Sequence, residues 1–356
     1  MNEPATSLES LRAQLSALGA SPLHERHLLR LWLQARPLDA GRRRPEHFLP
    51  AALREALPAL ASQWQQLARL RSRHPAPDGS ERLLVTLADG QTVESVLLPR
   101  GGLCVSTQVG CAVGCVFCAT GRDGLRRQLG SAEIAAQLAL ARRLRPVRKI
   151  VFMGMGEPAH NLDAVLEAIE LLGQEGGIGH KELVVSTVGD ERVFERLPRG
   201  RVKPALALSL HSTFAGRRQR LLPRAPRLAP ADLVARADAY ARATGYPLQV
   251  QWTLIDGVND GDDEVDALAA LLAGRHAMLN LIPYNDGGDG SPAVTPELRA
   301  AAAGVGGWRR PPMARVVEMT RTLNRRGVLT RIRHSAGQEV QGGCGQLRAR
   351  IVVEAG

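Results

Sequence analysis

Aromatic residues are scarce in this sequence: five Phe, four Trp and three Tyr make up 3% of its 356 residues. Sites for single-stranded nucleic acids stack bases on aromatic rings, so the composition gives little sign of such a platform. Lysine is also rare, at Lys149, Lys181 and Lys203 only, and arginine therefore supplies most of the positive charge behind the net charge of +11. Arginine suits phosphate binding, so a nucleic-acid partner would explain its abundance. A coding bias toward arginine would explain it equally well.

Long apolar runs are absent too. No window approaches eighteen consecutive apolar residues, which argues against a membrane span. The first residues, MNEPATSLESLRAQL, lack the basic and apolar regions of a signal peptide, so we expect a cytoplasmic protein with no membrane partner. Cysteine occurs only five times, an odd number in a long chain without an export signal. This excludes a disulfide framework as the first explanation and favours metal binding or thiol chemistry.

The patterns along the chain divide it into four parts. Residues 1–78 are predicted to form a helical accessory domain, with helices to about residue 75, and residues 79–99 a β-hairpin that turns at Asp89-Gly90. Residues 100–335 alternate strand-like and helical segments, which predicts an α/β domain with a parallel sheet, open or curved into a barrel. Residues 336–356 form a separate tail. The expected strands of the sheet are Lys149–Met153, Leu183–Ser186, Ala205–Leu210, Leu248–Leu254, Met278–Ile282 and Val328–Ile332.

Three cysteines lie within eight residues, as Cys111, Cys115 and Cys118. This C-x3-C-x2-C spacing places three thiolates on one tight loop, where Gly110 and Gly114 allow the backbone to approach closely. Four-iron clusters are normally held by four cysteine thiolates, so three local ligands leave one iron open for a substrate or cofactor. A structural zinc site usually pairs two C-x2-C units, and no second pair exists here. The loop therefore predicts a [4Fe-4S] cluster, with zinc or buried thiols as the alternatives.

An open iron beside a parallel sheet resembles the radical S-adenosylmethionine (SAM) superfamily. The segment Gly154–Pro158, which reads GMGEP after an expected strand, looks like the superfamily's GGEP-type motif for the methionine amino group of the cofactor. The resemblance is closer still to the RlmN/Cfr family of RNA adenine methyltransferases, and it covers about residues 80–350. It rests on these segments, in this order: CVSTQVGCAVGCVFCATG, MGMGEPAHN, VSTVG, LALSLH, NLIPYN and GGCGQL.

The RlmN/Cfr resemblance implies a fold and a reaction. The fold is a partial (β/α)6 TIM-like barrel of the radical SAM type, with the helical accessory domain and the hairpin. Cys344 would accept a methyl group from one SAM molecule, and a radical made from a second SAM would activate that methyl for addition to adenine. Cys104 would then release the base by forming a transient disulfide with Cys344. Glu94 matches a glutamate assigned as the proton acceptor. From the residues alone, Cys104 could instead be a fourth cluster ligand.

The same resemblance assigns residues that bind SAM and partners that complete the reaction. The substrate would be an adenine, at carbon 2, in 23S ribosomal RNA and possibly transfer RNA, and a flavodoxin or ferredoxin would donate electrons. Methylation at carbon 8, a divergent RNA substrate and a non-catalytic iron–sulfur or zinc RNA-binding module are the alternatives. Arg217, Arg218, Arg220 and Arg224 either face RNA phosphates or are ordinary exposed arginines. The residues assigned to SAM are Gly156, Glu157, Ser186, Ser209, Leu210, His211 and Asn285.

Overall fold

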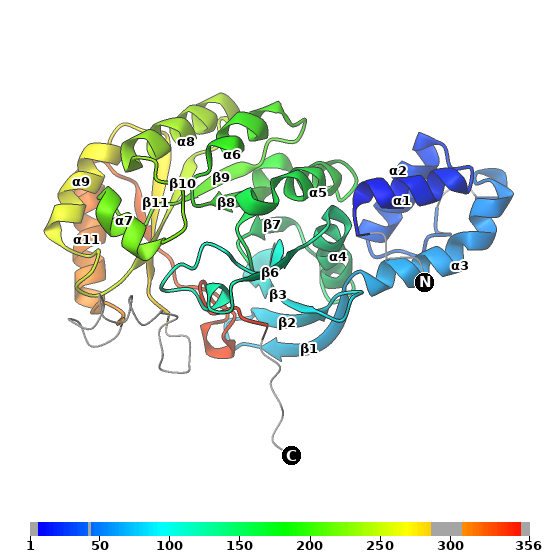
Figure 1. Cartoon of the computed structure of the whole chain (residues 1–356), viewed down its shortest axis with the longest axis horizontal. Coiled ribbons are helices and arrows are strands. Elements are labelled where there is room, and N and C mark those ends of the chain that lie inside the picture. The colour runs from blue at the N-terminus through cyan, green and yellow to red at the C-terminus, as the bar shows by residue number, and fades with distance from the viewer. Residues whose placement is uncertain (1–5, 42–43, 286–307, 350–356) are drawn as a thin grey trace, which may run out of the picture.

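The amino-terminal part of the chain is a small helical domain packed against the edge of a larger α/β domain (Figure 1). The computed structural model describes residues 6–41, 44–285 and 308–349. Ser7 and Ser21 cap the first two helices, and buried leucines such as Leu11 and Leu28 pack them on the third. The helices are α1 (Leu8–Ala17), α2 (Pro22–Leu33) and α3 (Ala51–Gln66).

Helix was expected to about residue 75, and this is wrong for Arg69–Pro75, which forms strand β1. Its alternate exposed and half-buried residues pair antiparallel with β2 (Glu81–Thr86), which pairs in turn with β3 (Thr92–Leu98). The pairing partner lies outside the segment, so local pattern could not reveal it. The hairpin at Asp89-Gly90 is confirmed, with Gly90 at a φ of +84°.

The larger domain is built on parallel strands, as expected. The hairpin continues into this sheet because β3 pairs antiparallel with β4 (Gly102–Cys104), and β4 pairs parallel with the next strand. The parallel strands follow each other in sequence order; each of the six segments expected to be strands overlaps one of them, and β4 is a seventh strand that was not expected. They are β4, β7 (Lys149–Phe152), β8 (Leu183–Thr187), β9 (Ala205–Ser209), β10 (Leu248–Leu254), β11 (Ala277–Pro283) and β12 (Thr330–Ile332).

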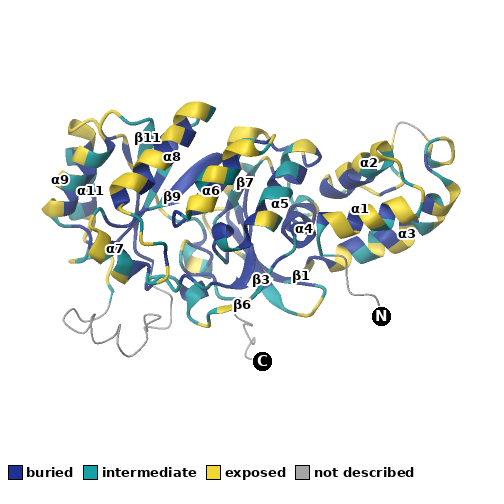
Figure 2. Ribbon diagram, turned by 45° about the horizontal axis from the view of Figure 1, so that its top comes forward, coloured by how far each residue is buried: buried dark blue, intermediate teal, exposed yellow. Residues whose placement is uncertain are grey.

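Helices cover the outer side of this curved sheet, and buried strands line its inner side (Figure 2). None of the helices in the described residues is both long and apolar enough to cross a membrane. A short separate pair, β5 (Gln108–Gly110) and β6 (Leu125–Gln128), encloses the cysteine loop. The covering helices are α4 (Ser131–Arg142), α5 (Leu162–Gln174), α6 (Glu191–Arg196), α7 (Ala215–Leu221), α8 (Pro230–Thr244), α9 (Asp262–Leu272) and α11 (Met313–Arg325).

The carboxyl-terminal tail returns to the start of the sheet, beside the cysteine loop and the hairpin (Figure 1). The guanidinium Nε of Arg82 in β2 donates to the carbonyl of Val340 at 2.6 Å. On the other side, Thr120 donates to the carbonyl of Leu347 at 2.6 Å, and the backbone N–H of Ala119 to that of Gly345 at 2.7 Å. The tail is therefore bound to two segments more than 200 residues earlier in the chain.

Candidate active site

The three cysteines of the loop line one cavity of about 150 Å³ at the carboxyl ends of the parallel strands. Gly110 begins the loop at a φ of +79°, and a Cβ there would lie 2.0 Å from the carbonyl oxygen of Gly124. Only glycine allows this approach, by which β5 and β6 bring the two ends of the loop together. The C-x3-C-x2-C spacing thus places Cys111, Cys115 and Cys118 around one space, as expected.

The thiols are surrounded by protein and by each other. Burial, followed by the neighbouring Cys118, raises the pKa of Cys111 to about 12, and the same two causes raise the pKa of Cys115. Among the described residues, no three His, Cys, Asp or Glu side chains form a group that could hold a metal ion. A single zinc needs thiolates at about 2.3 Å from one centre, whereas a four-iron cluster spreads its ligands over several irons. The donor set therefore fits a [4Fe-4S] cluster better than zinc.

Glu157 closes another side of this cavity, directly after the turn at Gly156. Its carboxylate accepts hydrogen bonds from the backbone N–H groups of Ala159 at 3.0 Å and Val188 at 3.1 Å. Burial nevertheless raises the pKa of Glu157 to about 7. A cationic group entering the cavity would compensate the buried carboxylate, which suits the ammonium of an amino acid.

His211 has an unusual backbone and a fixed ring. It is a non-glycine residue at a φ of +59°, which places it among the rare strained positions that gather at functional sites. Its Nδ1 accepts from the backbone N–H of Thr253 at 2.9 Å, so the neutral ring carries its hydrogen on Nε2. Burial, followed by the charge of Arg218, lowers the pKa of His211 to about 3. The ring therefore stays neutral at physiological pH and lines the cavity as a hydrogen-bond donor.

The other residues assigned to SAM divide into two groups. Ser186 and Ser209 line the cavity, with their hydroxyls 3.4 Å apart on neighbouring strands. Leu210 and Asn285 do not line it. The Leu210 side chain is in the core, and its N–H and C=O bond to the backbone of Gln251 and Ser212. Asn285 instead contacts the carboxyl-terminal tail.

The polar residues Gln251 and Thr253 of the cavity are among those not found from the sequence. Gln251 and Thr253 line it from β10, between the buried Val250, Trp252 and Leu254. Polar side chains at alternate positions of an otherwise apolar strand face one side of the sheet, and this alternation was visible in the sequence.

Cys344 lies on the tail and lines the cavity of Cys111, Cys115 and Cys118. Its side chain is open to the cavity, where it joins the three cysteines of the loop. Surrounding protein atoms still raise its pKa, and the charge of Cys118 raises it further. Cys104 is buried in β4, where burial and then the charge of Cys344 raise its pKa to about 12. All five cysteines are free thiols, and the pairing of Cys104 with Cys344 in a disulfide stays a prediction.

The tail is held so that Cys344 faces this cavity. Gly345 has a φ of +81°, and a Cβ there would lie 2.9 Å from the carbonyl oxygen of Phe117 in the cysteine loop. The side chain of Gln346 accepts from the N–H of Gly343 at 3.0 Å. The glycines on both sides of Cys344 therefore serve a close backbone contact.

Glu94 lies beneath the tail and not in the cavity. It is 1% exposed and forms an ion pair with Arg82, which is 4% exposed. Its second oxygen accepts from the backbone N–H of Arg348 at 2.7 Å. The contacts of Glu94 therefore connect the hairpin to the tail that carries Cys344.

The arginines that follow Ser209–His211 differ in their surroundings. Arg220 is exposed, but Arg217 is bound to Asp263 and Glu264. Arg218 is 3% exposed, so both alternatives for it, an RNA phosphate contact and an ordinary exposed arginine, are wrong. A charged side chain was assigned to the surface from its type alone, whereas the packing of α7 places it inside.

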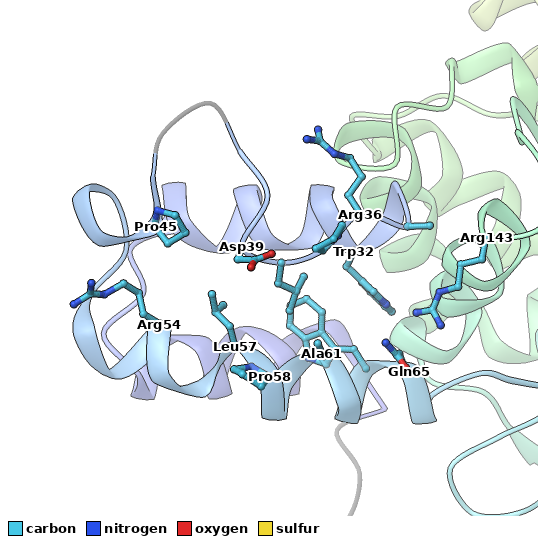
Figure 3. A pocket seen from close by; sticks show the side chains of 14 residues that line it. Trp32, Arg36, Asp39, Pro45, Arg54, Leu57, Pro58, Ala61, Gln65 and Arg143 are labelled. Atoms are coloured by element: carbon cyan, nitrogen blue, oxygen red, sulfur yellow. The ribbon is translucent and has the colours of Figure 1, made fainter.

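A larger hollow of about 670 Å³ lies in the helical domain, between α2, α3 and the end of α4 (Figure 3). It has an apolar lining that includes Trp32, Leu57 and Pro58, and it contains no cysteine or histidine. Arg36, Arg54 and Arg143 stand around it (Figure 3). Size therefore does not identify the reactive site, because the reactive groups gather in the smaller cavity.

Comparison with known proteins agrees with this site. The profile of the Radical SAM superfamily matches residues 105–271. A protein of Leptothrix cholodnii named Probable RNA methyltransferase is 64% identical over 343 residues, or 96% of this chain and 94% of that protein. One of the same description in Methylibium petroleiphilum is 67% identical, over 97% of this chain and 93% of its own length. The crystal structure of a radical SAM methyltransferase from Sphaerobacter thermophilus superimposes with a TM-score of 0.79 at 32% identity, covering 98% of this chain and all of that one.

The fold and the cysteine cavity thus define a SAM-dependent methyltransferase of the radical type. The chain belongs to the radical SAM superfamily and, within it, to the family of these methyltransferases, which confirms the resemblance to the RlmN/Cfr type. The partial barrel is confirmed with it.

Proposed function

We propose that this enzyme methylates a ring carbon of adenine, carbon 2, in 23S ribosomal RNA and in transfer RNA, with Cys344 as the methyl carrier. The observation that carries the proposal is the position of Cys344. It lines the cavity of Cys111, Cys115 and Cys118, and it interacts electrostatically with both Cys118 and Cys104. A carrier needs a radical source on one side and a second thiol on the other.

Cys111, Cys115 and Cys118 would hold the cluster, which would supply one electron for reductive cleavage of a carbon–sulfur bond of SAM to give a carbon radical. The Cys344 thiolate first displaces a methyl group from the sulfonium of another SAM, so that two SAM molecules are used per turnover. The S-methyl group gives one hydrogen atom to the radical, and its carbon bonds to the adenine carbon. The ring hydrogen then leaves as a proton, and the one electron that leaves with it would return to the cluster oxidised in the first step. Cys104 attacks the sulfur of Cys344, the carbon–sulfur bond breaks, and the released carbon takes up a proton. Two-electron reduction of the disulfide restores both thiols.

Glu94 is proposed as the acceptor of the ring proton, following the family resemblance. Arg82 and the N–H of Arg348 bind its two oxygens, and the side chain is almost wholly buried. Proton transfer to Glu94 therefore requires the tail that covers it to shift once Cys344 is bonded to the base. The remaining SAM contacts are proposed for Gly156, Glu157, Ser186, Ser209 and His211, which line the cavity. The assignment of Leu210 and Asn285, which do not line it, follows the family resemblance alone.

An RNA substrate is proposed because the relatives at 64–67% identity are named as RNA methyltransferases. The hollow of the helical domain offers a second contact for it. Arg36, Arg54 and Arg143 form no ion pair with any carboxylate of the described residues, unlike many arginines of this chain. Three arginines and one carboxylate, that of Asp39, line this hollow, and the excess of positive charge suits a nucleotide of a polyanion. A small electron-transfer protein of the flavodoxin or ferredoxin type is proposed as the reductant.

Two experiments test this function. Incubating Cys104→Ala enzyme with SAM, reductant and RNA should leave Cys344 cross-linked to adenine, because the releasing thiol is missing. Digestion and mass spectrometry would find the adduct, and Cys344→Ala should give none. Nucleoside mass spectrometry of RNA from a strain lacking the gene should show loss of one methyladenosine. Loss of 8-methyladenosine would show that the methylated atom is carbon 8 and not carbon 2. Unchanged RNA would contradict the proposal.

A further inference from the structure

Arg218 is buried behind the wall of the cysteine cavity. Its guanidinium donates to the backbone carbonyls of Val188 and, at 3.3 Å, Ser209, and both of these residues line the cavity. A third hydrogen bond goes to the carbonyl of Pro226 at 3.5 Å, and the Nε atom is buried without a partner in the described residues. All of these acceptors are neutral.

A buried cation without a carboxylate partner is costly. The preceding residue, Arg217, is bound to Asp263 and Glu264, so acidic partners exist on this side of the domain but are not used for Arg218. Burial lowers the pKa of Arg218 to about 10, which leaves it charged at neutral pH. The acidic groups whose electrostatic interaction raises the pKa of Arg218 against this effect are Cys115 and Glu157, and both line the cavity.

Helix α7 fixes this charge relative to the cysteine loop. The backbone N–H of Val116 donates to the carbonyl of Leu221 at 3.1 Å. Arg224, just after the helix, donates from its backbone to Val113 at 3.3 Å and from its side chain to Ala112 at 3.0 Å. The loop that carries Cys111 and Cys115 is therefore bound to the helix that carries Arg218.

We propose that Arg218 is a fixed counter-charge for the cluster, which favours the reduced state and so makes the cluster easier to reduce. This rests on the cluster of the proposed function. One-electron reduction adds a negative charge to a centre already bound by three thiolates, and a nearby cation in a medium of low dielectric constant stabilises that charge. Arg218 thus acts through its charge on the cluster and not by contact with the substrate.

The test is the reduction potential of the reconstituted cluster, measured by electron paramagnetic resonance during a mediated titration. Arg218→Gln should lower the equilibrium constant for reduction about tenfold, which is a shift of about 59 mV to more negative potential for one electron. Arg218→Lys keeps the charge and should stay close to the wild-type potential. Arg220→Gln is the matched control, because it removes an exposed arginine from the same helix and should shift nothing.

Cluster content and circular dichroism are measured beside the potential. If the Gln variant folds but takes up no cluster while the Lys variant does, the need for the charge is supported. Equal potentials of the Gln variant and wild type would overturn the proposal. So would a Lys variant that shifts as far as Gln, or loss of the cluster in both, because these outcomes indicate a packing role. A wild-type protein that assembles no four-iron cluster would instead contradict the proposed function.

Discussion

The side-chain amide of Asn285 donates a hydrogen bond to the main-chain carbonyl of Cys344 at 3.1 Å, and another to the hydroxyl of Ser335 at 2.8 Å. These contacts connect the chain just after β11 to Ser335, directly before the tail, and to Cys344 in the tail. Cys344, the proposed methyl carrier, is therefore attached to the barrel by a residue close to the end of a core strand.

Asn285→Ala should slow methylation of Cys344 by about fivefold to tenfold, since one net hydrogen bond contributes about 1 kcal/mol. The rate is measured by intact-protein mass spectrometry with cluster and SAM present but no reductant. Asn324→Ala is the control, because its amide bonds to Thr320 and Thr330, at the junction of α11 and β12. An unchanged rate in Asn285→Ala would show that the tail is positioned by other contacts.

Arg82→Met should destabilise the protein by about 3–5 kcal/mol, because it leaves the carboxylate of Glu94 buried without its cation. Combining it with Glu94→Gln should restore part of this loss, since the amide removes the charge and still accepts from the N–H of Arg348. Urea unfolding of both variants measures the difference. The hydrogen bond from Arg82 to Val340 is lost in both and does not contribute to it. If the double variant loses as much free energy of unfolding as Arg82→Met and Glu94→Gln lose in sum, then Arg82 and Glu94 do not stabilise each other.

His211 should make the folded protein less stable in acid. Its pKa is about 3 in the folded protein and near 6.5 in an exposed chain, so between these values the unfolded state binds more protons. The free energy of unfolding then falls as the pH is lowered from about 6.5, by at most about 1.4 kcal/mol per pH unit from this residue. His211→Gln should give a shallower pH profile in urea unfolding of the cluster-free protein between pH 4.5 and 6.5. If the pH profiles of wild type and His211→Gln are parallel, then His211 takes up its proton in the folded protein at the same pH as in the unfolded chain.

Replacing Arg36, Arg54 and Arg143 together by Gln should weaken RNA binding and reduce its dependence on salt. If each contacts one phosphate, the slope of log affinity against log salt should fall by about 2. Filter binding at several salt concentrations measures both. The control removes Arg192, Arg236 and Arg326, which are paired with acidic residues on the α/β domain. If both triple variants weaken RNA binding equally, the affinity depends on the net charge of the protein and not on the hollow.

Much of the fold followed from local sequence pattern. Alternating apolar strands and helices placed each expected strand of the barrel, because their periodicity reports burial directly. Strand β1 was missed since its stability comes from pairing with β2 and not from its own residues. Arg218 was misplaced for a related reason: residue type indicates exposure on average, while the packing of one helix determines it.

The spacing of Cys111, Cys115 and Cys118 determined by itself that three thiolates share a loop, because seven residues cannot carry them far apart. The sequence also provided Cys104 and Cys344, and the family resemblance paired them. Only the tertiary structure decided that Cys344 lines the cavity of the three cysteines, on a tail held by Thr120, Ala119 and Arg82. It also placed Glu94 beneath that tail and Arg218 behind the wall of the cavity. The contacts of the tail join residues more than 200 positions apart, and no local pattern records them.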